Sequence, residues 1–391
     1  MSRPFPIGAS VTVEELSASP YDVICRLREH EPVSWLPALN AWWVTRRDLA
    51  LVAMSDADTF TVADERFTTA RILGTSMLNL DGPEHRRHRS AFAAPFRPRY
   101  LREELEGRIA ACAERLWDQT IAGHGEIRTG IAGPLAVETI LDLMGLKVET
   151  SEVLQWYAAF GRAITALTIG EEVPDDVGET LSRLESHIRT VMSDLGSGFI
   201  ANLVDDKILH AEEIPAAVTV ILFGAIETSE AMTTNAFWHL FTHPESLTRV
   251  RHDHALIPAV INESLRLEPA ATWVDRYTTK DADLGDVTIP SGELVSISLL
   301  GANRDPEYFP QPSRFDIDRP NLARHVTFAK GPHTCLGLHV ARAETRSALV
   351  SALNWESNSG HTLRLDESQT TPPRGLIFRR AENVTLRREQ G

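Results

Sequence analysis

Of the three cysteines in the sequence, Cys335 has the most unusual surroundings. In "TFAKGPHTCLG", residues 327–337, it stands between a Gly-Pro-His turn and a Leu-Gly step that opens a helix-like segment. The cysteines are odd in number and far apart, which fits neither a disulfide framework nor a Cys-x-x-Cys metal site. We expect Cys25 and Cys112 to be buried structural thiols on helices. An inert buried thiol would be the default for Cys335 as well, so its neighbours must decide its role.

A second candidate site lies in "AAVTVILFGAIETSEAMTTNAFWHLFTH", residues 216–243, which reads as one long helix ended by Pro244. Such a helix would be roughly 45 Å long and could cross a whole domain. Its apolar half contains Gly224, Glu227 and Thr228, and each of these is locally unfavourable in a buried helix. Either the helix surfaces here and Glu227 is solvated, or the helix opens a groove in which a carboxylate and a hydroxyl face a ligand.

A third set of residues carries opposite charges. Glu263 and Arg266 in "NESLRLEP" share one face of a helix. Most such pairs are solvated surface pairs of small worth. Arg314 lies in a proline-rich loop at 303–319, and we expect its guanidinium to share the carboxylate of Glu263.

The elements that must position these residues are mostly helices. In "LREELEGRIAACAERLWDQTI", residues 101–121, apolar residues recur every three or four positions. Strand signals are fewer: "AWWVTRRD" and "VTIPSGELVSISLL" (287–300) are typical of β-ribbon pieces. We expect the segment at 303–319 to be a long ordered loop because apolar and aromatic side chains stand among its prolines.

The composition limits the classes of function. With 391 residues, 43 % hydrophobic and 24 % charged, the chain can bury a large core. A net charge of −15 argues against general nucleic-acid binding, although residues 85–102 form a basic stretch without an acidic residue. No apolar run suggests a secretion signal or a membrane anchor, so we expect a cytoplasmic protein.

In this order, the motifs resemble the cytochrome P450 family, specifically its soluble bacterial members. The matching segments are Gly-Ala-x-Glu-Thr at 224–228, Glu-x-x-Arg at 263–266, "NRDPEYFPQPSRFDIDR" at 303–319, and "FAKGPHTCLG" at 328–337. "DGPEHRRHRSAF" at 81–92 matches the family's His-x-x-x-Arg helix, so the likeness extends across nearly the whole chain. The resemblance implies one P450 domain over residues 1–391. It also implies a mainly α fold with small β-sheets (α+β), and haem between a long central helix and a Cys-bearing proximal loop.

The resemblance further implies haem b (iron protoporphyrin IX) as the cofactor, with Cys335 as its proximal thiolate ligand. A thiolate donates electron density to iron and favours O–O cleavage. Gly331 and Gly337 would let the backbone approach the porphyrin, and the helix after Cys335 would aim N–H groups at the sulfur. The other matched cofactor residues are Phe328, near the sulfur, and the propionate-binding His85, Arg89, Arg276 and His333.

The implied activity is monooxygenation, in which one atom of O₂ enters an apolar substrate and the other leaves as water. Thr228 would hydrogen-bond dioxygen, and Glu227 would connect it to solvent protons. Glu263, Arg266 and Arg314 would form a triad that maintains the fold under the haem rather than a catalytic site.

The expected substrate is a hydrophobic small molecule with a few polar groups, one of which could be an acidic group that pairs with Arg71. By family position, the pocket residues are Arg71, Met77, Leu78, Asn79, Phe160, Ala225, Trp273, Val274 and Leu376. The sequence departs from the family pattern at Ala329 and Ala225, where glycine is more common. The first puts the loop geometry in doubt, and the second would narrow the oxygen pocket.

The expected partners are a ferredoxin and a ferredoxin reductase fed by NAD(P)H, because the sequence contains no Gly-x-Gly-x-x-Gly, flavin domain or ferredoxin-type cysteine cluster. The basic stretch could receive an acidic ferredoxin, although a solvated helix face explains it nearly as well. We expect a monomer without nucleic-acid or membrane partners. Phenol coupling, desaturation and peroxide-driven oxidation stay open, as does a non-catalytic haem-thiolate binding or sensor protein. The Glu227-Thr228 pair favours use of O₂.

Overall fold

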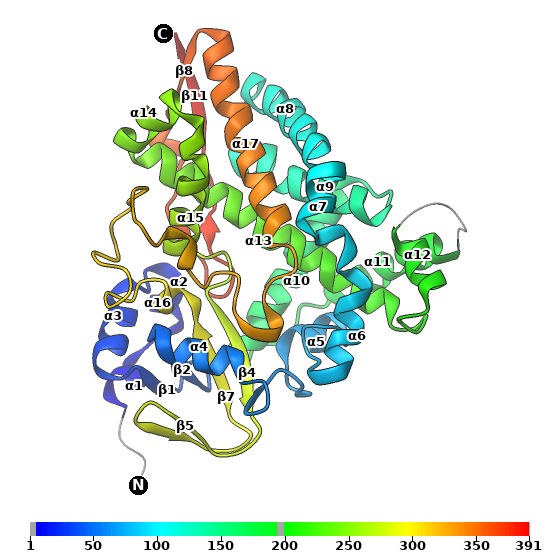
Figure 1. The fold of residues 1–391 in the computed structure, drawn as a ribbon, viewed down its shortest axis with the longest axis vertical. Helices are drawn as coiled ribbons and strands as arrows, with labels where there is room; N and C mark the ends of the chain where they lie inside the picture. The colour runs from blue at the N-terminus through cyan, green and yellow to red at the C-terminus, as the bar shows by residue number, and fades with distance from the viewer. Residues whose placement is uncertain (1–4, 194–198, 391) are drawn as a thin grey trace.

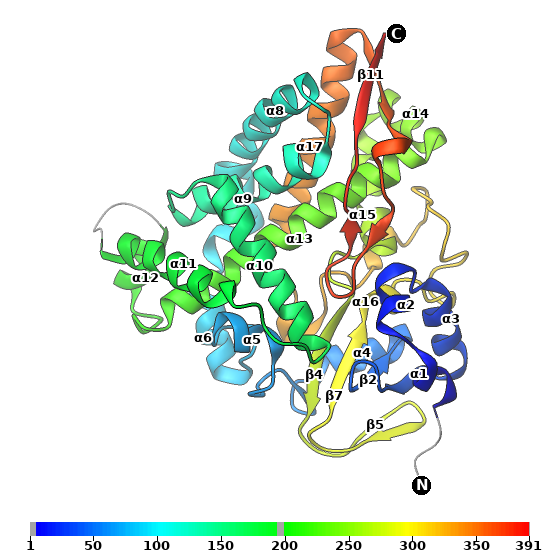
Figure 2. The ribbon, with the colours of Figure 1, turned by 180° about the vertical axis from the view of Figure 1, so that it is seen from behind.

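The computed structural model describes residues 5–193 and 199–390 of the chain. Helices make up most of it. The strands β1, β2, β4, β5 and β7 lie near the N-terminal helices at one end, and β8 and β11 lie at the opposite end (Figure 1). The N-terminal and C-terminal ends lie at opposite ends of the long axis, as both views show (Figures 1 and 2). The expected fold class, mainly α with small β-sheets, is confirmed.

Residues 5–193 and 199–390 contain seventeen α-helices. They are α1 Pro6–Ser10, α2 Val13–Ala18, α3 Tyr21–His30, α4 Arg47–Ser55, α5 Thr68–Leu73, α6 Gly82–Phe92, α7 Pro98–Tyr100, α8 Glu106–Ala122, α9 Gly133–Met144, α10 Thr150–Thr168, α11 Asp176–Ser193, α12 Phe199–Asp206, α13 Ile214–Thr242, α14 Pro244–His252, α15 Ile257–Leu267, α16 Leu299–Ala302 and α17 Leu338–Ser359. The 3₁₀ and π turns are η1 Ala94–Phe96, η2 Leu101–Leu105, η3 Arg128–Ala132, η4 His254–Leu256, η5 Leu322–Arg324, η6 Gly331–His333 and η7 Glu367–Gln369.

The largest sheet has five strands in the order β1-β2-β7-β4-β3, in which only β2 and β7 are parallel. The strands are β1 Val33–Leu36, β2 Ala41–Val44, β3 Phe60–Thr61, β4 Trp273–Thr278, β5 Ala282–Leu284, β6 Val287–Ile289, β7 Leu294–Ser298, β8 His361–Leu365, β9 Pro373–Arg374, β10 Arg380–Ala381 and β11 Leu386–Gln390. The segment 287–300 contains two strands as predicted, but they belong to different sheets, since β6 pairs with β5 while β7 pairs with β2 and β4.

Helix α13 confirms the predicted long helix and crosses the interior of the molecule (Figure 1). It packs against α9, α10, α15 and α17, and therefore its apolar residues are buried on almost every side. By length and composition α13 could also span a bilayer, but 72 % of its most apolar window is buried inside the protein. Helix α13 is therefore a core helix of the protein.

The two cysteines outside the proximal loop differ from each other. Cys112, on the predicted apolar face of α8, is half-buried and packs against the core. Cys25 is exposed, so the prediction that it is buried is wrong. The buried face of α3 is formed instead by Val23, Ile24 and Leu27.

The loop at 303–319 closes around the guanidinium of Arg266. Arg266 and Glu263 are fully buried and pair through two N–H···O bonds of 2.7 and 2.8 Å. Arg266 also donates to the backbone carbonyls of Asn303, Pro312 and Arg314. One buried cation therefore organises a long segment that has little regular structure of its own.

The third member of this charged group is Arg319, and the prediction of Arg314 is wrong. Arg319 Nε lies 3.3 Å from Glu263 Oε1, and its side chain is 4 % exposed. The side chain of Arg314 is exposed, and only its carbonyl takes part, as an acceptor for Arg266 and Arg319. Phe315, the residue after Arg314, is buried, and this directs the neighbouring Arg314 side chain outward.

We predict that Arg319→Met lowers the free energy of unfolding by about 3 kcal/mol, because it leaves part of a buried carboxylate and several carbonyls without a donor. Arg314→Met is the matched control, with a change within about 0.5 kcal/mol. Denaturant unfolding followed by circular dichroism measures both. An equal loss in the Arg314 variant would contradict the assignment.

Candidate functional site

The proximal loop, defined here as residues 326–337, holds Cys335 through backbone bonds. The N–H of Cys335 donates to the Phe328 carbonyl at 2.9 Å, and the N–H of Ala329 donates to the Val326 carbonyl at 2.8 Å. Ala329 has φ 55°, in the left-handed region. An alanine in this region costs roughly 1–2 kcal/mol, a cost that glycine avoids. The departure at Ala329 therefore strains the backbone locally, but the loop keeps its hydrogen bonds.

The two glycines of this loop are required for different reasons. Gly331 has φ 77°, and a Cβ there would lie 2.5 Å from the carbonyl oxygen of Met54 at the end of α4. A Cβ on Gly337 would meet only the ring of Phe96, at 4.0 Å. Packing against α4 therefore requires a glycine at 331, whereas a side chain at Gly337 would meet little of the protein.

Cys335 is exposed, and several neighbouring protein groups act on its thiol. The residue is accessible, yet burial raises the pKa of its thiol. Backbone N–H groups of Gly337 and Leu338, at the start of α17, oppose this shift by stabilising the thiolate, and so does the charge of Arg89. The donors that the sequence predicted at the start of this helix are therefore present.

Arg342 is a neighbour of the loop that the sequence analysis missed. Its guanidinium lies 5.0 Å from the centre of the Phe328 ring and donates to Asn262 Oδ1 at 2.9 Å. Its charge also lowers the pKa of Cys335. The available signal was a basic residue in the first turns of α17. The motif alone does not show which residues of that helix face the loop.

The four basic residues expected at the haem propionates come from α6, β4 and the proximal loop. The rings of His85 and His333 are 4.3 Å apart, and Arg89 donates to the Thr334 carbonyl at 2.6 Å. His85 Nε2 and Arg276 Nη2 are buried and have no hydrogen-bond partner among the described residues. Burial lowers the pKa of His85 to about 4. Buried donors of this kind need an acceptor, so a group that carries carboxylates fits this side of the site.

Asp81 connects three parts of the site and was also missed. Its Oδ1 lies 2.8 Å from His333 Nε2, and its Oδ2 accepts hydrogen bonds from Thr61 Oγ1 at 2.6 Å and from the Val62 N–H at 2.9 Å. Burial alone would raise the pKa of Asp81, but the hydrogen bonds from His333 and Thr61 lower it far below its ordinary value. One carboxylate therefore joins β3, the start of α6 and the proximal loop.

The stretch of α13 at which the sequence predicts a groove is partly exposed. Gly224 is exposed, and Ala225 and Thr228 are half-buried, in a helix that is otherwise almost fully buried. A Cβ on Gly224 would meet no atom within 4 Å. Thr228 Oγ1 donates to the Gly224 carbonyl at 2.5 Å, which is the back-bonding that loosens a helix at such a position.

Glu227 does not share this exposure. It is 7 % exposed, and its Oε1 lies 2.5 Å from Nη1 of Arg380, on β10. A Cβ on Gly161 of α10 would lie 3.7 Å from the carboxylate, so the backbone of α10 also covers Glu227. The interpretation of a solvated Glu227 is therefore wrong. The groove interpretation is wrong for this residue too, because the carboxylate is buried against Arg380 and does not face the exposed stretch with the Thr228 hydroxyl. The sequence could not indicate Arg380, which stands far along the chain.

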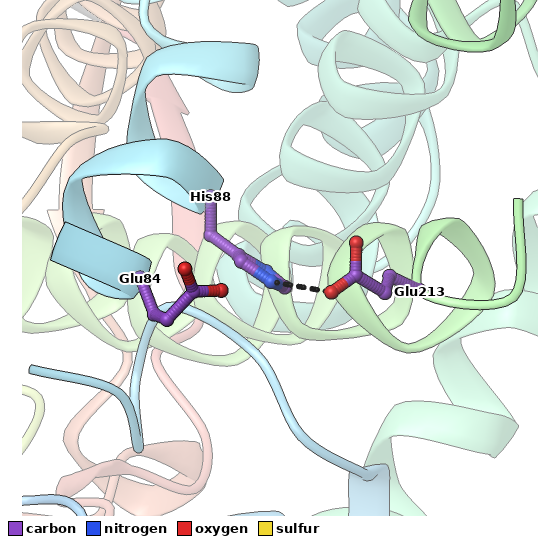
Figure 3. A group of neighbouring side chains, drawn as sticks. All are labelled: Glu84, His88 and Glu213. Atoms are coloured by element: carbon purple, nitrogen blue, oxygen red, sulfur yellow. Dashed lines mark hydrogen bonds and ion pairs between the residues drawn. The ribbon is translucent and has the colours of Figure 1, made fainter. Parts of the chain in front are cut away.

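A cluster of one histidine and two glutamates lies between α6 and the start of α13 (Figure 3). His88 points from α6 toward Glu213, with Nε2 3.2 Å from Oε1, and Glu84 lies beside them. The ligand atoms are close enough together to hold a metal ion. Arg87, however, donates to both carboxylates at 2.6 Å. Because its guanidinium already neutralises the pair, we interpret the cluster as an ionic link between two helices.

The structure divides the expected substrate residues. Arg71 and Trp273 line a cavity of about 750 Å³ between the five-stranded sheet, α5 and the C-terminal end of α10. Phe160 is fully buried with its ring edge-on to Tyr157, so its predicted place in a pocket wall is wrong. The remaining residues are mixed: Met77 and Leu376 are buried, Asn79, Ala225 and Val274 are half-buried, and Leu78 is exposed.

Comparison with known proteins identifies relatives along most of the chain. The family model described as Cytochrome P450 matches residues 179–357. Cyclomarin C epoxidase CymV of Salinispora arenicola is 31 % identical over 340 residues, which cover 83 % of this chain and 85 % of the relative. The 6-deoxyerythronolide B hydroxylase of Saccharopolyspora erythraea is 26 % identical over 395 residues, which cover 94 % and 95 %.

Solved structures agree with the fold. The crystal structure of CalO2 superposes with a TM-score of 0.85 at 23 % identity, covering 96 % of this chain and 98 % of that chain. That of P450BioI, in complex with an acyl carrier protein ligated with hexadec-9Z-enoic acid, has a TM-score of 0.83 at 26 % identity, covering 96 % and 100 %.

We predict that Asp81→Asn lowers the free energy of unfolding by about 1–3 kcal/mol at pH 7, because the charge-assisted bond to His333 is lost. The pKa of Asp81 is depressed in the folded protein, so its contribution is full above about pH 4 and disappears as the pH falls further. Urea unfolding at several pH values measures the difference. Asp58→Asn, at an exposed position nearby, is the control, and an equal loss there would contradict a specific role for Asp81.

Proposed function

Because the chain belongs to the cytochrome P450 family, and is therefore a monooxygenase with haem b, we propose that it oxidises a hydrophobic small molecule with electrons from separate redox proteins. The observation that carries this proposal is the position of Cys335 at the start of α17, with backbone N–H groups directed at its sulfur. When bound, the haem supplies the activation of O₂ from which one oxygen atom enters the substrate.

The residues that would hold the haem fall into two groups. Cys335 would be the iron ligand, with Phe328 and Gly337 beside it. The donors His85, Arg89, Arg276 and His333 would face the propionates. The unpartnered nitrogens of His85 and Arg276 support this assignment, because a propionate would satisfy both. His333 would be held in place by Asp81.

We assign proton delivery to Thr228 and Glu227. The Thr228 hydroxyl lies in the opened part of α13, where it can hydrogen-bond a substrate oxygen or a water. Glu227 is the next residue, and its carboxylate can carry protons to that side only if it turns away from Arg380. Controlled proton supply matters because stray protonation wastes the oxidant.

The cavity lined by Arg71 and Trp273 would bind the substrate. This volume suits a drug-sized molecule. Arg71 forms no ion pair among the described residues and could bind an acidic group of the substrate. The names of the epoxidase and hydroxylase relatives support a role in bacterial secondary metabolism.

The remaining parts of the proposal concern partners and location. A ferredoxin and its NAD(P)H-dependent reductase would supply electrons to a monomeric, cytoplasmic enzyme that is one domain over residues 1–391. Burial of α13 in the core supports a protein that needs no membrane. Arg86, Arg97 and Arg102 are exposed and unpaired among the described residues, whereas Arg87 and Arg99 are neutralised by glutamates.

We predict that Thr228→Ala lowers the product formed per NAD(P)H consumed by about tenfold, because protons then arrive without control. A spin-state screen would first provide a substrate, and product and peroxide would then be quantified together. Thr228→Ser, which keeps the hydroxyl, is expected to retain most of the coupling. Unchanged coupling in the alanine variant would contradict the role.

We also predict that Arg97→Glu with Arg102→Glu slows electron transfer from an acidic ferredoxin by about tenfold or more at low salt. Phe96 packs at Gly337, so these arginines lie near the proximal loop. Stopped-flow reduction measures the rate, and basic changes on the ferredoxin should restore it. Arg26→Glu, on the exposed surface of α3, is the control, and an equal effect there would mean that no local docking surface exists.

A further inference from the structure

Glu227 shares its arginine with a second buried carboxylate. Glu230 lies one turn further along α13, and both glutamates are 7 % exposed. Arg380 contacts both of them, with Nη1 2.5 Å from Glu227 Oε1 and Nε 3.2 Å from Glu230 Oε1. Arg128, in η3, approaches Glu230 Oε1 at 3.2 Å from another side.

These four residues form a set that is balanced in charge and largely buried. Two carboxylates face two guanidiniums, and the side chain of Arg380 is 15 % exposed. Burial raises the pKa of Glu230, whereas the charges of Arg380 and Arg128 lower it. The set therefore tolerates little change in charge unless another member compensates.

The proposed role of Glu227 requires such a change. A proton taken up by Glu227 removes its negative charge and weakens its pair with Arg380, so that the side chain can turn toward Thr228. Arg380 would then be a buried cation without a partner, which is strongly unfavourable. Glu230 is already in contact with Arg380 and can accept it at that moment.

We propose that Glu230 is a positioning residue for proton delivery, which holds Arg380 whenever Glu227 leaves it. The inference rests on the proposed function of Glu227. In one transfer Glu227 gains a proton on the solvent side and releases it on the Thr228 side, so that no charge changes overall. During the rest of the cycle Arg380 stays with Glu227, and the guanidinium of Arg128 then compensates the negative charge of Glu230.

The test uses Glu230→Gln in the haem-loaded enzyme, with a substrate found by the spin-state screen. Without the second carboxylate, protonation of Glu227 strands Arg380. We therefore expect kcat to fall about tenfold with KM unchanged, and the solvent deuterium isotope effect on kcat to rise. Glu230→Asp keeps the charge and should recover most of kcat. Glu212→Gln is the control, because Glu212 is exposed and forms no ion pair among the described residues.

Two further measurements keep the inference testable if Glu230→Gln folds poorly. Arg128→Gln leaves Glu230 with Arg380 alone, so Glu227 is released more easily and the isotope effect should fall. A double-mutant cycle of Arg380→Gln and Glu227→Gln, followed by thermal unfolding, measures the coupling between these two residues. In the Glu230→Asp background, whose shorter side chain holds Arg380 less closely, this coupling should be stronger than in the unmodified protein.

The outcomes separate this inference from the proposed function. If Glu227→Gln lowers kcat but Glu230→Gln leaves kcat and the isotope effect unchanged, Glu230 is only structural and the inference is overturned. If Glu227→Gln itself has no effect on kcat, the proposed role of Glu227 fails, and the inference fails with it.

Discussion

The burial of carboxylates on α13 is the constraint around which much of this structure is arranged. A helix that lies in the core presents Glu227 and Glu230 where water cannot solvate them, and an uncompensated charge there would be strongly destabilising. The compensating arginines come from distant segments, Arg380 from β10 near the C-terminus and Arg128 from η3. The folded chain must therefore bring both segments to the middle of α13 before the helix is stable in place.

Other buried charges near the site are also compensated by residues of opposite charge or by backbone groups. Glu263 and Arg266 neutralise each other completely inside the protein, and backbone carbonyls of the 303–319 loop satisfy the remaining guanidinium donors. Asp81 pairs with His333 and thereby joins the proximal loop to the start of α6. These buried pairs position groups more than they contribute net stability, because their desolvation offsets most of their attraction.

Local patterns predicted the elements well, and long-range partners could not be predicted. The apolar run ended by Pro244 indicated α13, and Gly224 with Thr228 indicated its groove, because both signals are contained in one segment. The partner of Glu263 was predicted in the correct loop but at the wrong arginine, since loop geometry decides which side chain turns inward. Asp81, Arg342 and Arg380 were missed because their roles depend on contacts between segments that no spacing rule connects. Phe160 was misplaced because the phase of α10 against its neighbours is set by packing.

The strand that follows Arg380 has a consequence for engineering the chain. β11 pairs with β8, and the N–H of Leu386 donates to the Gly125 carbonyl, so the C-terminal hairpin is fastened to the end of α8. Arg380 therefore owes its position to residues at the very end of the protein. A reductase domain or an affinity tag fused after Gln390 would leave this anchor intact, whereas a truncation before Thr385 would remove the strand that keeps Arg380 beside Glu227. The C-terminal strand is therefore part of the framework that pairs Arg380 with Glu227.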